Sequence, residues 1–392
     1  MGGALVRALD PASAAVASWI LTFLLHSTLL LGGAWLLLRF RDVRPAWEEI
    51  LWRLAVLVPV LTATAHAVAD VDPLVDAWDV TLLHPASGAG ASAAAAGPVT
   101  GLPGAIMGLL VAHWWLWLAL AWAVGAAAHL LRLVRRNRRL LSALAGRRPA
   151  SGRRGRLLRE SLEAVGAPPR VRTSVLAGIG TPLALGLREV VVPPDLVERM
   201  EGAPLRGVLA HEVAHLVRGD PLWSLAGGVI RALCWFQPLC ATARRRLEEL
   251  AEIRADAWAV ERTGEPLAVA KGLEAVARAL SGRPRPATAG LAAAGERRAG
   301  LLARVTRILE PGPGEGRPVP ARARSALAAA VLVLTLGALP SFTPIHDRDD
   351  DIAEWGRAAS ARPAAIPVPA PPVGRTAPLA ARRRPRTRPS GT

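Results

Sequence analysis

Four stretches of the chain are almost entirely apolar and long enough to cross a lipid bilayer. A transmembrane helix needs about 20 apolar residues, because each residue rises about 1.5 Å through a hydrocarbon core about 30 Å thick. The runs of about this length lie at residues 14–38, 50–69, 105–131 and 325–342, and the last is the shortest. The pattern therefore predicts an α-helical membrane protein with about four transmembrane helices.

Between the third and fourth apolar runs the pattern changes to that of a mixed α/β domain. Short runs of β-branched and apolar residues at 171–176 and 188–192 predict strands, because glycine or proline bounds them. The linking residues 181–187 have a mixed pattern. From residue 195 onward the apolar positions recur at helical spacing, and we expect one helix to end near Gly219.

The predicted organisation has four parts. They are an N-terminal membrane region at 1–134, a mixed α/β domain at 135–324, a fourth transmembrane helix at 325–342 and a Pro/Ala/Arg-rich tail at 343–392. We expect the tail to be disordered. The first apolar run is long and its basic residues follow it, so we interpret it as a retained anchor rather than a cleaved signal peptide.

The net charge of +17 comes largely from arginine-rich segments that flank the apolar runs on one side. Residues 132–159 hold eleven arginines and no acidic residue, whereas residues 70–104 hold four aspartates and no lysine or arginine. By the positive-inside rule, the domain after the third run faces the cytoplasm and both termini lie outside. Because no aromatic residues are interleaved with these arginines, we expect contact with membrane lipids and no direct binding of nucleic acid.

His211, Glu212 and His215 form the sequence HEVAH on the predicted helix that ends near Gly219. Residues four apart lie one above the other on a helix, so both imidazoles can bind one zinc ion. The glutamate between them is then placed to act as general base toward a metal-bound water. The alternative is a helix whose two histidines only pair with neighbouring carboxylates.

A hydrolytic zinc site needs a third protein ligand, and the sequence favours a carboxylate. Pro221 occupies the position of the third histidine in the HExxHxxGxxH pattern. We expect Glu252 to be the third ligand and Asp256, four residues on, to accept the outer N–H of a ligand imidazole. Glu248 and Glu249 are the fallback ligands, and their alternative role is a solvated face that pairs with neighbouring arginines.

Residues 221–240 form a further apolar stretch, which we interpret as a core or re-entrant helix broken near Pro238. Arg231 lies in its middle, where a charge is costly in lipid. A single membrane crossing at this point would also place Glu252 on the opposite side of the membrane from His211. The two groups would then be unable to share a metal ion.

Four segments resemble the BlaR/MecR antirepressor family of membrane zinc metallopeptidases, typified by the β-lactam sensor-transducers of bacteria. They are TPLALGLREVVVPPDL at 181–196, HEVAHLVRGDPLW at 211–223, WFQPL at 235–239 and AEIRADAWAV at 251–260. The resemblance implies a zincin-like domain in which His211, His215 and Glu252 bind zinc and Glu212 is catalytic. It also implies that residues 183–192 hold substrate as an extended strand. The tail has no SxxK motif, so we expect no penicillin-binding sensor domain.

These features predict a gluzincin-like zinc endopeptidase of the bacterial inner membrane that cleaves a cytoplasmic protein, such as a transcriptional repressor, in signal transduction. A separate sensor protein and a homodimer are compatible with the sequence. One alternative is a non-proteolytic transducer in which zinc only braces the fold. The other is a protease for membrane-protein quality control, because the Glu252–Asp256 element is similar to that of CAAX prenyl proteases and heat-shock peptidases.

Overall fold

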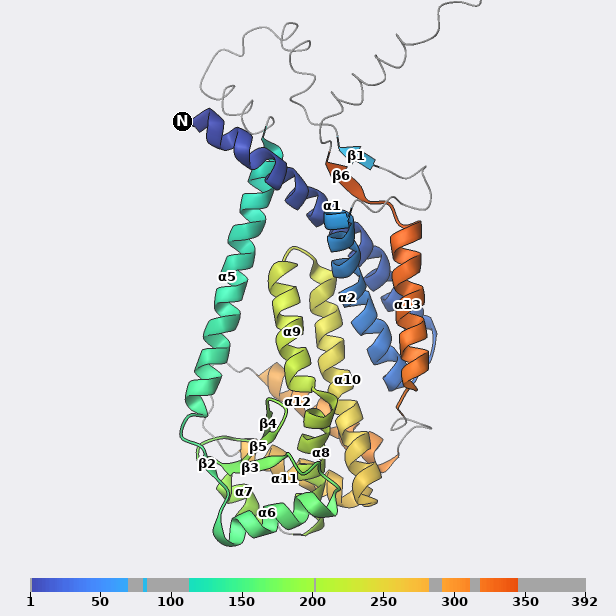
Figure 1. The fold of residues 1–392 in the computed structure, drawn as a ribbon. Coiled ribbons are helices and arrows are strands. Elements are labelled where there is room, and N and C mark those ends of the chain that lie inside the picture. The colour runs from blue at the N-terminus through green and yellow to red at the C-terminus, as the bar shows by residue number, and fades with distance from the viewer. Residues whose placement is uncertain are drawn as a thin grey trace, which may run out of the picture. The chain divides into compact units, whose positions relative to one another are not determined.

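The structure is a computed structural model that describes residues 2–69, 80–82, 113–200, 202–281, 291–310 and 318–344. Helices predominate in this part of the chain, and Figure 1 shows their arrangement. The helices are α1 (Gly2–Phe40), α2 (Pro45–Ala69), α5 (Trp114–Ala143), α6 (Gly152–Ala164), α7 (Pro194–Arg199), α8 (Ala203–Arg218), α9 (Asp220–Leu233), α10 (Pro238–Thr263), α11 (Pro266–Ser281), α12 (Leu291–Leu309) and α13 (Ala321–Ala338). The strands are β1 (Val80–Leu82), β2 (Arg148–Pro149), β3 (Arg172–Val175), β4 (Leu183–Leu185), β5 (Glu189–Val192) and β6 (Phe342–Pro344). The predicted disordered tail lies outside the described residues from 345 onward.

Four of the helices are long and apolar enough to cross a membrane, as the sequence predicts. These candidate spans are Ala12–Phe40 in α1, Pro45–Val68 in α2, Trp114–Ala143 in α5 and Ala321–Ala338 in α13. The helices α1 and α2 pack against each other, and α5 and α13 contact α1 and α2 respectively. The chain is therefore a mainly helical protein with four candidate membrane helices.

Helix α2 begins at Pro45, before the predicted start at 50, and the ends of α5 and α13 also differ from the predicted spans. Helix α5 continues past residue 131 to Ala143, because the arginines and leucines there both favour helix. Residues 105–112 of that predicted span lie outside the described part of the chain. Helix α13 ends at Ala338 rather than at 342, because Leu339 precedes Pro340 and a residue before proline disfavours helical backbone.

A four-stranded sheet in the order β2-β3-β5-β4 contacts the histidine-bearing helix α8. The predicted strands at 171–176 and 188–192 correspond to β3 and β5, which pair in parallel. The link at 181–187 contains a further strand, β4, which pairs antiparallel with β5 and forms one edge of the sheet. Strand β4 has only three residues, which is too few to show an alternation of apolar and polar positions in the sequence. It is defined instead by its pairing with β5.

Helix α8 is packed tightly between the sheet and α11. The valines at 190–192 in β5 are fully buried, and Val190 and Val192 join the core that α8 covers. On the other side, two glycines allow α8 and α11 to approach closely. A Cβ atom at Gly207 would lie 2.9 Å from the Cα of Val269, and one at Gly272 would lie 2.8 Å from the carbonyl oxygen of Pro204. The helix that carries the histidines is therefore fixed from two directions.

Helices α9 and α10 lie side by side (Figure 1). Hydrogen bonds with α1 and α5 hold the turn between them. The predicted break near Pro238 is confirmed, since α9 ends at Leu233 and α10 begins at Pro238. In the turn, Gln237 donates a hydrogen bond of 2.9 Å to Ser27 Oγ of α1. Trp122 of α5 donates a hydrogen bond of 2.8 Å to the carbonyl of Leu233. Helix α10 therefore extends from the candidate membrane helices toward α8.

Candidate metal centre

Both ends of helix α8 have residues that suit a helix end. Pro204 lies in its first turn, where the missing N–H would have no helical partner. Gly219 ends the helix with φ of 71°, a left-handed conformation that glycine adopts without steric cost. The next helix, α9, begins directly after this glycine, so the chain changes direction and Asp220 faces back toward His215.

The structure brings the three predicted ligands together at one point. The Nε2 atoms of His211 and His215 lie 3.1 Å apart. The Glu252 carboxylate faces both rings, with Oε2 3.5 Å from His211 Nε2 and Oε1 3.6 Å from His215 Nε2. Zinc bonds of about 2.0–2.1 Å at tetrahedral angles place neighbouring ligand atoms about 3.3 Å apart. This group, found among the described residues, therefore has the donors and spacing to hold one zinc ion.

Each imidazole is also held at its second nitrogen by an aspartate. His211 Nδ1 lies 2.9 Å from Asp256 Oδ1, and His215 Nδ1 lies 2.8 Å from Asp220 Oδ2. A carboxylate at Nδ1 keeps the proton on that nitrogen and leaves Nε2 with a free lone pair for a metal. The structure thus places Asp256 against His211 and adds Asp220, which the sequence analysis missed.

Two arginines hold these aspartates. Arg304 of α12 contacts both carboxylate oxygens of Asp256, at 2.7 and 2.8 Å, and its NH1 lies 2.9 Å from Glu252 Oε2. Arg218, in the last turn of α8, donates to Asp220 Oδ2 at 3.1 Å. Sequence reasoning missed both arginines. No short motif contains Arg304, which lies on a helix remote in sequence from the HEVAH residues.

Glu248 and Glu249 lie outside the metal-compatible group within the described part of the chain. Glu248 lies 2.9 Å from Arg244, and Glu249 lies 2.8 Å from Arg246. Both carboxylate side chains are more than half exposed, at 55% and 60%. This arrangement is the solvated face that the sequence offers as the alternative to their use as ligands.

The buried charges of the site oppose one another. Burial alone would lower the pKa of His211, but Asp256 and Glu252 outweigh it and raise that pKa to about 10. Burial would raise the pKa of Glu252, but the hydrogen bond to His211 and neighbouring positive charges lower it to about 2. Burial raises the pKa of Glu212. Several carboxylates around two imidazoles therefore favour a cation at this point.

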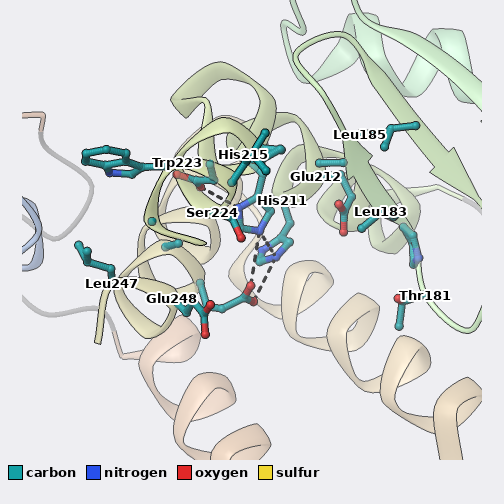
Figure 2. A pocket seen from close by; sticks show the side chains of 18 of the residues that line it. Thr181, Leu183, Leu185, His211, Glu212, His215, Trp223, Ser224, Leu247 and Glu248 are labelled. Atoms are coloured by element: carbon teal, nitrogen blue, oxygen red, sulfur yellow. Dashed lines mark hydrogen bonds and ion pairs between the residues drawn. The ribbon is translucent and has the colours of Figure 1, made fainter. Parts of the chain in front are cut away.

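A cavity of about 1770 Å³ opens beside the histidines. In Figure 2, Leu183 and Leu185 lie on the side of Glu212, and Trp223 and Leu247 lie on the other side of the histidines. The first two residues belong to the edge strand β4, and the backbone of its middle residue forms a hydrogen bond with the Glu212 carboxylate. The metal-compatible group, the glutamate and a strand edge therefore share one cavity.

Comparison with known families gives a match that includes the three predicted metal ligands, Glu212 and the two aspartates, but not Arg304 of α12. The model of the family described as BlaR1 peptidase M56 matches residues 47–266, which is more than half of the 392-residue chain. The match begins in the first turn of α2 and ends at the start of α11, so it contains α8, α9 and α10. No curated protein matches the chain. The predicted resemblance is confirmed, and the chain belongs to the BlaR1 peptidase M56 family.

Proposed function

We propose that this chain is a zinc endopeptidase, anchored in the bacterial inner membrane, that cleaves a protein on the cytoplasmic side. The observation that carries the proposal is the convergence of His211, His215 and Glu252, whose ligand atoms lie 3.1–3.6 Å apart. Two imidazoles and one carboxylate form a donor set of zinc hydrolases and leave one position for water. Membership of a peptidase family supports the same reaction.

The protein's own part in hydrolysis is to orient the ligands and to move a proton. When bound by the three ligands, zinc supplies a lowered pKa for water and polarises the substrate carbonyl. Glu212 is buried, and burial raises its pKa. Its carboxylate is thereby suited to accept a proton from the attacking water and then deliver it to the leaving amine. Asp256 and Asp220 keep the two rings in place during these steps.

We assign substrate binding to the edge strand β4. One edge of β4 pairs with β5, and residues of β4 line the cavity beside Glu212. An extended peptide can join such an edge through main-chain hydrogen bonds. Leu183 and Leu185 would then contact alternate side chains of the peptide. The sequence-based range of 183–192 is too wide for this role, because β5 lies inside the sheet and only the β4 end of the range lines the cavity.

The arginine distribution supports the cytoplasmic location. Arg39 is in the last turn of α1, and arginines follow residue 131 in α5. Arg322 and Arg324 lie at the start of α13. The ends of α5 and α13 adjoin the chain segment that contains the peptidase residues, and the end of α1 leads to the start of α2, which contacts α8 and α10. Positive charge of this kind marks the cytoplasmic side.

The proposed function allows two classes of protein substrate. Antirepressor activity within the resembled family suggests a single defined target, such as a transcriptional repressor. A quality-control protease would instead cut many misfolded membrane proteins. The two are distinguished by the number of proteins whose cleavage depends on Glu212.

The test is Glu212→Ala, with Glu249→Ala as the matched control on an exposed glutamate. Glu212→Ala should retain stoichiometric zinc by elemental analysis and lower cleavage by roughly 10²–10⁴-fold, as expected for loss of a general base. Glu249→Ala should keep both zinc and cleavage, because its carboxylate lies on the solvated face of α10. Cleavage is measured as new protein N-termini in cells that express each variant.

Each outcome has a defined meaning. New N-termini that arise from one protein in wild-type cells and vanish with Glu212→Ala support the single-target proposal. New N-termini from many membrane proteins support quality control. Normal cleavage by Glu212→Ala removes Glu212 from the mechanism, and purified wild-type protein without a stoichiometric transition metal contradicts the zinc site.

A further inference from the structure

The first turns of α2 contain two adjacent glutamates that are buried and fully paired with arginines. Glu48 is 8% exposed and Glu49 is 4% exposed. Glu49 forms ion pairs with Arg53, Arg218 and Arg254. A buried carboxylate is stable only where positive charge and hydrogen bonds compensate it. The ion pairs between Glu49 and the arginines of α8 and α10 therefore depend on the position of this end of α2.

A continuous set of short contacts leads from Glu49 to a predicted metal ligand. Glu49 Oε1 lies 2.8 Å from NH2 of Arg218. The Nε atom of Arg218 donates to Asp220 Oδ2 at 3.1 Å. That same oxygen lies 2.8 Å from His215 Nδ1. Three contacts thus connect a candidate membrane helix with the imidazole of His215.

The second oxygen of Glu49 reaches the helix of the third ligand. Glu49 Oε2 lies 3.2 Å from NH1 of Arg254, which is the second residue after Glu252 on α10. The carboxylate of Glu49 therefore joins the end of α8 to the middle of α10. These are the two helices on which the three predicted ligands lie.

The neighbouring glutamate has similar chemistry but no such route. Glu48 contacts Arg246 of α10 through both oxygens, at 2.6 and 3.0 Å. Arg246 in turn pairs with Glu249, on the solvated face of α10. Within the described residues, no hydrogen bond or ion pair of this group reaches His211, His215 or Glu252, or the two aspartates that hold the imidazoles. Both glutamates fasten α2 to α10, but only Glu49 reaches the site.

We propose that Glu49 is a positioning residue for the metal centre, acting on His215 through Arg218 and Asp220. This proposal rests on the proposed function, because it takes the group of His211, His215 and Glu252 as the zinc site. A shift of α2 would separate Glu49 from Arg218, and Arg218 would then hold Asp220 differently. The position of a membrane helix thereby sets how firmly His215 is held for the metal, which gives the peptidase a means of regulation from the membrane.

The test compares Glu49→Gln with Glu48→Gln in the full-length chain in detergent micelles. Each change removes one buried negative charge from adjacent positions of one helix and keeps the side-chain shape. Zinc affinity is measured by competition with a chelator, and ligand geometry by the visible absorption of the Co²⁺-substituted protein. Glu49→Gln should weaken zinc binding by about 10-fold and alter the Co²⁺ spectrum, as loss of an outer contact of a ligand does. Glu48→Gln should leave both within about 2-fold of wild type.

A second pair of variants tests the route itself. Asp220→Asn should also weaken zinc binding, and the double change with Glu49→Gln should weaken it by less than the product of the two single effects. Residues that act through one shared contact are non-additive in this way. Glu49→Asp retains the charge on a shorter side chain, and it replaces Glu49→Gln in these measurements if Glu49→Gln does not fold. It should alter the Co²⁺ spectrum with a smaller loss of zinc affinity.

Wild-type zinc affinity and Co²⁺ spectrum in Glu49→Gln, or in Glu49→Asp where that variant serves, overturn the proposal. An equal loss in Glu48→Gln also overturns it, because any loosening of α2 would then have the same effect, as does strict additivity with Asp220→Asn. Failure of the proposed function is separate. Wild-type protein that binds no zinc refutes both, whereas zinc-loaded wild type without peptidase activity refutes only the cleavage reaction and leaves the zinc measurements valid.

Discussion

At the scale of single residues, the two histidines are held in the same manner. In each case an arginine contacts an aspartate, and the aspartate contacts Nδ1 of the imidazole. The two sets are Arg304, Asp256 and His211, and Arg218, Asp220 and His215. An imidazole whose orientation and tautomer are fixed in advance loses less freedom when it binds a metal. Zinc affinity should therefore depend on residues that never contact the ion.

Asp256→Asn tests this dependence. The amide is uncharged, so it holds the Nδ1 proton of His211 less strongly and no longer pairs fully with Arg304. We expect zinc affinity to fall by roughly 10–100-fold, the usual cost of losing such a partner. The measurement is competition between the purified variant and a chelator of known affinity.

Asp195→Asn is the matched control, because Asp195 is exposed in the first turn of α7. It should change zinc affinity by less than about 2-fold, since it contacts neither histidine in the described structure. If Asp256→Asn binds zinc as tightly as this control does, the contact with His211 has no part in metal binding.

The extent to which the sequence predicts the site follows from how local each contact is. His211 and His215 are four apart on one helix, and Glu252 and Asp256 are four apart on another, so helical spacing brings out both pairs. Asp220 depends on the turn at Gly219, and a glycine one turn after the second histidine, followed at once by an aspartate, was the available signal in the sequence. Arg304 depends only on tertiary packing of α12, which no local pattern encodes.

At the scale of elements, the position of α8 depends on its close contact with α11. The two helices meet at Gly207 and Gly272, where a side chain would overlap the partner. Close backbone approach at glycine fixes the separation of two helices more strictly than flexible side chains do. The metal ligands of α8 should therefore be sensitive to a single added methyl group in this contact.

Gly207→Ala tests the contact. The new Cβ would lie 2.9 Å from the Cα of Val269, a backbone atom that cannot rotate away. We expect a loss of about 1–3 kcal/mol in the free energy of unfolding, as for other overpacked cores. Thermal unfolding in detergent, followed by tryptophan fluorescence, gives the comparison.

Gly227→Ala is the control for the helical preference of alanine. Gly227 lies within α9, and a Cβ there would meet nothing within 4 Å. The change should stabilise the protein by up to about 1 kcal/mol, because alanine favours helix over glycine. Equal stability of Gly207→Ala and Gly227→Ala would show that α8 and α11 do not pack as closely as the structure has them.

The elements were predicted best where a long periodic pattern defines them. The four apolar helices and the break at Pro238 follow directly from hydropathy and from proline geometry. Strand β4 does not, because three residues hold too little pattern and its pairing with β5 is what stabilises it. The end of α5, at Ala143 rather than at 131, differs from expectation for a related reason: hydropathy marks apolar length and does not mark where a helix ends.

At the scale of the molecule, the candidate membrane helices and the peptidase residues are connected by contacts that include the turn before α10 and the start of α2. The turn before α10 is hydrogen-bonded to α1 through Gln237, and α10 continues from there to Glu252. The start of α2 is connected through Glu49 to both α8 and α10. The peptidase residues are therefore part of the same compact unit as the membrane helices, and the side of the membrane on which they lie decides which proteins they can reach.

That side is tested with single added cysteines in the full-length chain. Ser151→Cys lies at the start of α6, within the arginine-rich segment 132–159, and Val68→Cys lies at the far end of α2. If the arginines face the cytoplasm, a membrane-impermeant maleimide added to intact spheroplasts should label Val68→Cys and leave Ser151→Cys unlabelled until lysis. The measurement is the mass shift of the protein before and after lysis.

Wild-type protein is the control, because Cys234 and Cys240 are 1% and 4% exposed and should react slowly on either side. During membrane insertion, loops rich in arginine are not translocated and remain in the cytoplasm. The HEVAH helix should therefore lie on the same side of the membrane as these arginines. Labelling of Ser151→Cys in intact spheroplasts would place the site outside the cytoplasm. A cytoplasmic repressor would then be out of reach, and substrates would have to be sought among proteins of the cell envelope.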